Sequence, residues 1–286
     1  MLEREEYIEQ AHFFSAIAGR QQTGLSTQEL LAAVREEILS TTRLPLAIDF
    51  LNGELKLNGV FHTAMAQLGH YFTPFQTFAV AEAENDRGRF DMAMAMEILA
   101  REARYRAEGA TAQGIFLYEF ESISRNRLHY DRGLQAIAGD VEFDQAWKEW
   151  IGLVRHQIGL VDFADLIFVR SEHYRRRQLA QTGGDDPQAA ERPVLFGEGE
   201  GRIALANRGK DPLLLFGALH RHLGYPDVPR PPKSDVSPQL IPLLVRRVER
   251  LEARLKLVEE EAKGGIDLSQ FYAPPDRSSR APELPE

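Results

Sequence analysis

Acidic side chains in apolar surroundings are the first residues of this sequence that could do chemistry. Glu119 and Glu121 interrupt the apolar run IFLYEFESI, and Arg125 follows Glu121 by four residues. Paired carboxylates can act as general acid and base when burial drives their pKa values apart. Residues four apart on a helix are also neighbours, and a partly buried Glu–Arg pair is a common structural device. We therefore predict an internal ion pair between Glu121 and Arg125.

Two further sets of carboxylates could serve either chemistry or solubility. Asp162 and Asp165 are three residues apart in an apolar segment, and Glu172 continues their stripe. Glu82 and Asp86 are four residues apart beside two arginines. A solvated or arginine-paired helix face explains both sets, and Asp162 is also favourable in the first turn of a helix. We predict this structural role for both sets.

The histidines do not form a metal-binding pattern. A di-iron bundle needs paired Glu-x-x-His motifs, but Glu172 and His173 are adjacent, and no His-Glu-x-x-His motif occurs. His220 and His222 are two residues apart, which on a helix separates them by about 200°. There is no cysteine to supply a thiolate. The sequence therefore assigns no catalytic, cofactor-binding or metal-binding residue and implies no cofactor.

Two runs resemble ligand-binding segments only superficially. GEGEGR, which begins at Gly197, lacks the lysine and serine or threonine of a phosphate-binding loop, and its glutamates would repel phosphate. Short apolar runs flank it, so we predict a β-hairpin with a glycine-rich turn. The basic run that begins at Arg170 could contact RNA or an acidic partner. It also complements the dipole at the end of a predicted helix, which is the interpretation we prefer. Its members are Arg170, Arg175, Arg176 and Arg177.

The elements that carry these residues are predicted to be helices, because their apolar residues recur with a period near 3.6. Phe143, Trp147, Trp150, Ile151, Val154 and Ile158 define one such face. A second segment is apolar on two faces and is expected to be sandwiched between neighbouring helices. One face consists of Met92, Met96, Leu99, Ala100 and Ala103. The other consists of Phe90, Met94 and Ile98. The run Gly159–Val169 is apolar nearly all round, which predicts a central helix.

Helix boundaries follow from capping signals. Ser26 and Glu29 form a capping box, Pro45 suits the first turn of a helix that Asn58-Gly59 ends, and Thr73-Pro74 starts another. The predicted helices are 1–19, one starting at Ser26, 45–57, 62–71, 73–88, 89–107, 111–138, 143–158, 160–178 and 212–222. The predicted fold is all-α: a multi-helix bundle or irregular α-solenoid, with a small β-hairpin-plus-helix unit and a C-terminal coiled-coil helix.

A helical array invites a search for internal repeats. Gly88, Phe90, Ala93 and Ala100 have spacings similar to the second half of a tetratricopeptide unit. Tyr130 and Gly133 repeat only part of this pattern forty residues later, and the expected proline is missing. Because that period is longer than a tetratricopeptide repeat uses, we prefer a generic bundle or irregular solenoid.

Composition shifts divide the chain. We predict a helical core domain at 1–180, a linker at 181–192, a hairpin-helix unit at 193–226, a proline-rich spacer at 227–236, a coiled-coil helix at 237–263 and a disordered tail at 264–286. The tail holds an apolar cluster around Phe271 that could be a docking peptide. The coiled coil rests on a heptad seam from 241 to 262. Its a positions are Ile241, Val248, Leu255 and Ala262, and its d positions are Leu244, Leu251 and Val258.

The whole sequence indicates a non-enzymatic helical scaffold or adaptor that binds a protein or peptide and forms a homodimer through 241–262. The formal charge of −9 disfavours nucleic-acid binding, and no apolar run is long enough to span a membrane, so we expect a cytoplasmic protein. Two alternatives stay open. One is an enzyme whose carboxylates and histidines assemble between helices, and the other is a nucleic-acid-associated regulator that uses the basic run.

Overall fold

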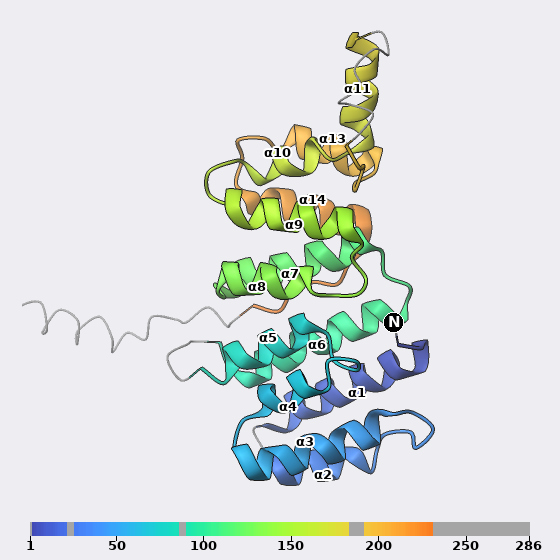
Figure 1. Ribbon diagram of the computed structural model, residues 1–286, viewed down its shortest axis with the longest axis vertical. Coiled ribbons are helices and arrows are strands. Elements are labelled where there is room, and N and C mark those ends of the chain that lie inside the picture. Colours follow the sequence, from blue (N-terminus) through green and yellow to red (C-terminus); the bar gives the residue numbers. More distant parts are fainter. Residues whose placement is uncertain (1, 22–25, 86–89, 183–191, 231–286) are drawn as a thin grey trace, which may run out of the picture. The chain divides into compact units, whose positions relative to one another are not determined.

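The fold is all-α, as predicted, throughout the part of the chain that the structure describes. The structure is a computed structural model, shown in Figure 1, and it describes residues 2–21, 26–85, 90–182 and 192–230. Within these ranges there is no β-strand, and only two isolated bridges occur. In chain order the helices are α1 (Arg4–Arg20), α2 (Thr27–Arg35), α3 (Leu44–Asn58), α4 (Phe61–Gln67), α5 (Pro74–Ala83), α6 (Met92–Ala107), α7 (Ala112–Asn126), α8 (Tyr130–Ala138), α9 (Gln145–Gln157), α10 (Phe163–Phe168), α11 (Glu172–Thr182), α13 (Glu198–Ala206) and α14 (Pro212–Leu223).

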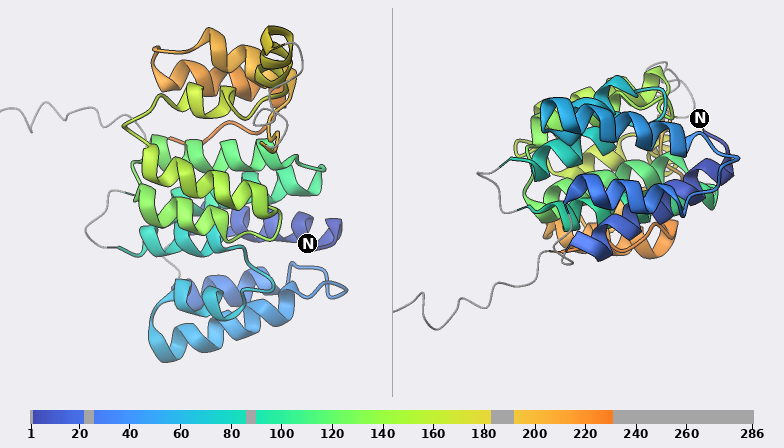
Figure 2. Two further views of the ribbon diagram at one scale, coloured as in Figure 1. Left: turned by 45° about the horizontal axis from the view of Figure 1, so that its top comes forward. Right: turned by 90° about the horizontal axis from the view of Figure 1, so that it is seen from below.

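The helices stack in layers that follow the chain. α2 and α3 pack together at one end, α1 lies along α6, and α5 contacts α4, α6 and α8. Next come α7, α8 and α9, and the stack continues through α14 to α10 and α13 (Figures 1 and 2). All of these helices belong to one compact unit, and residues 231–286 lie outside the described residues.

The predicted capping signals operate as expected. Ser26 accepts a hydrogen bond from the Glu29 amide, while the Glu29 carboxylate accepts one from the Ser26 amide at 2.9 Å. Thr73 and Gln76 form an equivalent box at the start of α5. Gly59 ends α3 with a φ of 71°, a left-handed conformation that glycine adopts without steric cost.

One hydrophobic core runs through all of the layers. Trp150 is fully buried and Trp147 is 6% exposed, which confirms the predicted buried face of α9. The sandwiched helix is also confirmed, because Leu99 and Ile98, which lie on its two predicted faces, are both fully buried. Leu195, Phe216 and Tyr225 belong to the same core as these helices. Whether 193–226 forms a domain of its own stays a prediction.

Two predicted helices are each broken in the structure. Residues 111–138 form α7 and α8, because Arg127 ends α7 with a left-handed φ of 55°. The prediction of a central helix over Gly159–Val169 is wrong: Gly159 has a φ of 83°, Leu160 is 84% exposed, and only the short α10 remains. The predicted helix 160–178 likewise splits into α10 and α11, with Ser171 between them.

The predicted β-hairpin around GEGEGR is also wrong. Phe196 forms an isolated bridge with Ser171, and EGEGRIALA is the helix α13, with Gly197 at its N-cap. The glycines serve close packing here: a Cβ on Gly199 would lie 2.4 Å from Nε2 of His222, and one on Gly201 would lie 2.2 Å from Oγ of Ser171. Neither glycine has a positive φ, so no turn geometry requires them.

Several predicted segments lie outside the described residues. They are most of the linker at 181–192, the end of the spacer at 227–236, the coiled-coil helix at 237–263 and the tail at 264–286. Gln181 and Thr182 of the predicted linker are the last residues of α11.

Candidate functional site

The most heavily charged site in the interior surrounds Arg106 on α6. Its guanidinium donates hydrogen bonds to Glu102 at 2.8 Å, to Glu119 at 3.0 Å and to Asp140 at 2.6 Å. Glu102 comes from the previous turn of α6, Glu119 from α7, and Asp140 follows α8 by two residues. All four side chains are at most 3% exposed. We call this set the Arg106 cluster.

The Arg106 cluster carries more acid than base. One guanidinium faces three carboxyl groups, and Oε2 of Glu102 and Oε2 of Glu119 have no donor among the described residues. Burial, followed by repulsion from Glu102, raises the pKa of Glu119 well above its usual value. Burial also raises the pKa of Glu102, and the two carboxyl groups are hydrogen-bonding neighbours. A proton bound by either carboxyl group would supply a donor and lower the charge of the cluster.

This geometry suits a structural role in joining helices better than a catalytic role. The three carboxyl groups are 0–1% exposed, so they are not accessible to a substrate in this structure. The hydrogen bonds instead join α6, α7 and the end of α8. Burial lowers the pKa of Arg106, but the three carboxylates together raise it well above its usual value, so the guanidinium stays charged.

The predicted pair of Glu121 and Arg125 forms. Arg125 donates from Nε to Oε1 of Glu121, and the Tyr225 hydroxyl donates to Oε2 at 2.7 Å. Burial, followed by the Glu121 carboxylate, raises the pKa of Tyr225, which keeps its hydroxyl protonated as a donor. Glu121 therefore connects α7 to the segment after α14, and sequence spacing could not identify this third partner.

The other predicted carboxylates have structural partners. Asp162 caps α10 and accepts a 2.6 Å hydrogen bond from the Gly209 amide, and Asp165 pairs with Arg208. Glu172 pairs with two arginines of the basic run, Arg175 and Arg176. Glu82 is buried and accepts a 2.6 Å hydrogen bond from Nδ1 of His129. Asp86 lies outside the described residues.

The two C-terminal histidines have separate partners. Nε2 of His220 lies 3.5 Å from Oδ1 of Asp227, and Nε2 of His222 lies 3.3 Å from Oε1 of Glu200. No group of three or more acidic or histidine side chains among residues 2–21, 26–85, 90–182 and 192–230 is arranged to hold a metal ion. None of the helices in these ranges is long and apolar enough to cross a membrane.

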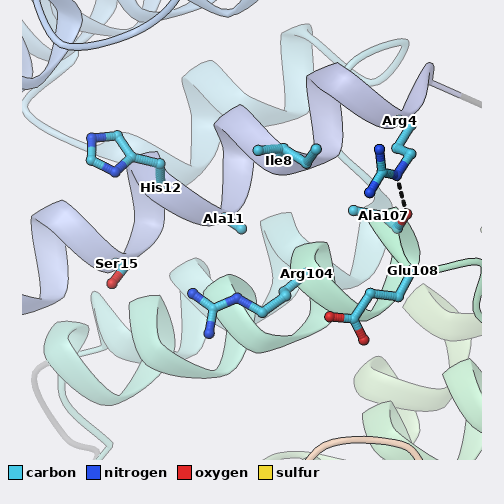
Figure 3. Close-up of a pocket in the computed structure, with 8 residues that line it drawn as sticks. All are labelled: Arg4, Ile8, Ala11, His12, Ser15, Arg104, Ala107 and Glu108. Carbon is cyan, nitrogen blue, oxygen red and sulfur yellow. Dashed lines mark hydrogen bonds between the residues drawn. The ribbon is translucent and has the colours of Figure 1, made fainter.

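An open groove follows the outer side of α6. Its first part is a ~310 Å³ hollow between α1 and α6, lined by Ile8 and His12 of α1, by Arg104 of α6 and by Glu108 (Figure 3). Adjoining hollows of ~220, ~340 and ~450 Å³ share Arg101: the first of them also lies between α1 and α6, and the other two lie between α6 and residues 224–230. We call the whole feature the α6 groove. Sequence periodicity missed it because it depends on how α1 and 224–230 pack beside α6.

The α6 groove holds a cation that no residue in the described part of the chain neutralises. The exposed side chain of Arg104 makes no hydrogen bond or ion pair with a described residue, although it lines three of the four hollows. Arg4 uses Nε to donate to the Ala107 carbonyl at 3.2 Å, which leaves its terminal nitrogens beside the first hollow (Figure 3). Arg101, in contrast, is paired with Glu97 and with the Asp227 carbonyl.

The first hollow of the α6 groove therefore combines charged side chains of both signs with a small apolar surface. Ile8, which is 42% exposed, and the small side chains of Ala11 and Ala107 supply the apolar part of its first hollow. No family model, curated protein or solved structure matches this chain.

Proposed function

We propose that the protein is a non-enzymatic helical scaffold that binds an acidic peptide segment of a partner protein in the α6 groove and self-associates through its C-terminal helix. The observation that carries the first half is the unpaired Arg104 beside exposed Ile8 in an open groove. Arginine is enriched in protein interfaces and is a frequent anchor of binding when it lies next to apolar surface.

The dimensions of the groove favour a peptide over a small metabolite. Its four hollows share lining residues across the outer side of α6, which suits an extended chain better than one compact ligand. A guanidinium binds a carboxylate through two parallel N–H donors, so Arg104 and Arg4 can each bind one acidic side chain. An aliphatic residue between the two acids would cover Ile8 and Ala11.

Replacing Arg104 with glutamate is expected to weaken peptide binding at least tenfold, about 1.4 kcal/mol, because the variant repels the acid that the wild type binds. The measurement starts with selection of displayed random peptides of about 12 residues against the full-length protein. Fluorescence polarisation then gives the affinity of the selected sequences. We expect them to place Asp or Glu beside an aliphatic residue.

The matched control is Arg202→Glu, which reverses the charge of an exposed arginine on α13. It should bind the selected peptides within twofold of the wild type, and both variants should melt at the wild-type temperature. Equal affinity of the wild type and Arg104→Glu, or selection of basic peptides, would show that the α6 groove is not the binding site.

The second half of the proposal rests on the heptad seam at 241–262, which lies outside the described residues. In a parallel dimer Arg247 and Arg254, at g, would meet Glu252 and Glu259, at e, of the other chain. Light scattering should therefore give a mass of at least a dimer for the full-length protein at micromolar concentration. Leu251→Glu places a charge in the seam and should yield a folded protein of lower mass. A monomeric parent contradicts this part of the proposal.

A further inference from the structure

A stripe of exposed apolar residues lies on the outer face of α3, in the last layer of the stack. Leu46 is 74% exposed and Leu57 is 80% exposed, and half-buried Phe50 lies between them. At 100° per residue these side chains and Gly53 fall within about 60° of one another. The opposite face of α3 is fully used, because it contributes Ala47, Ile48, Leu51 and Leu55 to the core. We call Leu46, Phe50, Gly53 and Leu57 the α3 stripe.

Gly53 has no explanation within its own chain. Glycine inside a helix costs about 1 kcal/mol relative to alanine. A Cβ at this position would meet nothing within 4 Å, and the residue does not have a positive φ. Neither local packing nor backbone geometry therefore requires it. A glycine at the centre of an exposed apolar face permits the close approach of something outside the chain.

The spacing of the α3 stripe fits a second copy of the same helix. Its residues are separated by four, three and four positions, so the stripe reads the same in both directions. Two antiparallel copies related by a twofold axis between Phe50 and Gly53 therefore place Phe50 of each on Gly53 of the other. Leu46 of each then meets Leu57 of the other. A twofold interface requires this self-complementarity.

The flanking charges agree with the antiparallel arrangement. Asp49 and Lys56 lie on the same side of the α3 stripe, and in this register they come within about 3 Å of each other along the axis of the paired helices. Each Asp49 can therefore contact Lys56 of the second copy in addition to Arg35 of its own chain. Glu54, on the other side, is already held by Asn58 and Gln67.

We propose that α3 is a self-association surface on which two copies of the chain pack antiparallel through the α3 stripe. This contact is separate from the C-terminal seam and does not depend on it. One helix face per copy gives an interface at the small end of the range for specific complexes, so we expect a dissociation constant in the micromolar range.

Site-directed cross-linking tests both the contact and its direction. The chain has no native cysteine, so every disulfide comes from an introduced residue. Full-length Leu46→Cys and Leu57→Cys proteins are made in the Leu251→Glu background, which prevents pairing through the C-terminal seam. An equimolar mixture of the two should oxidise to a covalent dimer. Each protein alone should not, because antiparallel pairing separates identical positions by about 16 Å.

Two controls fix the meaning of the result. A mixture of Leu46→Cys with Val141→Cys, which alters a site 79% exposed, measures random collision. Adding Phe50→Glu to both members of the main pair should reduce their covalent dimer to that collision level. The proposal is overturned if the main pair forms no more covalent dimer than the random-collision control. The α3 stripe would then bind a different partner. Efficient cross-linking of Leu46→Cys with itself also overturns it, because that outcome requires parallel helices.

Discussion

Replacing Trp150 with alanine is expected to lower the free energy of unfolding by ~3–5 kcal/mol, the range for removing a large aromatic side chain from a core. The indole ring is fully buried, lies 4.8 Å from the Phe116 ring and 5.1 Å from the Phe196 ring, and donates from Nε1 to the Leu166 carbonyl at 3.2 Å. The substitution leaves a cavity and an unpaired carbonyl where α7, α9 and α10 meet. Urea denaturation followed by circular dichroism measures the loss.

Leu153→Ala is the matched control on the same helix. Leu153 is 38% exposed, so truncating it should cost less than about 1 kcal/mol. Should the Trp150 variant unfold at the same urea concentration as the wild type, the apolar face of α9 would be a surface and not a core.

The parts of the fold that sequence reasoning predicted are those that local chemistry decides. A serine followed three residues later by glutamate satisfies amides within one turn, so Ser26 defines the start of α2 without any tertiary contact. The spacing of Trp147 and Trp150 likewise identifies a buried face wherever the helix packs. Arg127 gave no such signal, because arginine is a good helix former and only the packing of α8 back onto α7 explains its left-handed backbone.

The glycine-rich segment shows how a local signal can mislead. Glycines between two apolar runs predicted a turn, because turns are the commonest reason for such a pattern. In the structure Leu195 and Phe196 pair with the chain around Arg170, which lies far away in sequence, and the helix α13 starts at once. Gly199 and Gly201 then admit His222 and Ser171, contacts that only the folded chain reveals.

The candidate sites were predictable to the same limited extent. The Glu121–Arg125 pair lies within one helix, so its spacing was sufficient evidence. Glu119 was noticed as an acid in an apolar run, but its partner Arg106 is 13 positions away on another helix and Asp140 is 34 positions from Arg106. The α6 groove depends on α1, which is separated from α6 by four other helices in the chain.

Replacing Arg106 with methionine is the second change expected to have a large effect, a loss of ~3–5 kcal/mol in the free energy of unfolding. Methionine fills a similar volume, so the loss measures charge and hydrogen bonding and not a cavity. Without the guanidinium, Glu102, Glu119 and Asp140 lose the one cation that compensates them in the interior. The variant should therefore regain part of its stability as the pH falls, because burial raises the pKa values of Glu102 and Glu119 and both can bind protons there.

Glu119→Gln tests whether the charge of Glu119 sets the stability of the Arg106 cluster, or whether any substitution there destabilises it. The glutamine amide has the shape of the protonated acid but cannot ionise. Burial raises the pKa of Glu119 in the folded protein above the value of about 4.3 in an unfolded chain. At a pH between the unfolded and the folded pKa of Glu119, only the folded state keeps this carboxyl group protonated. Rising pH therefore destabilises the wild type by about 1.4 kcal/mol per pH unit through this group. That contribution is complete at low pH and disappears as the pH rises through the raised pKa.

The glutamine variant cannot lose the proton, so its stability relative to the wild type should increase from pH 5 to pH 8. Urea denaturation of both proteins across this range measures the difference, and parallel pH profiles would show that Glu119 is ionised in the folded protein and that the cluster holds no shared proton.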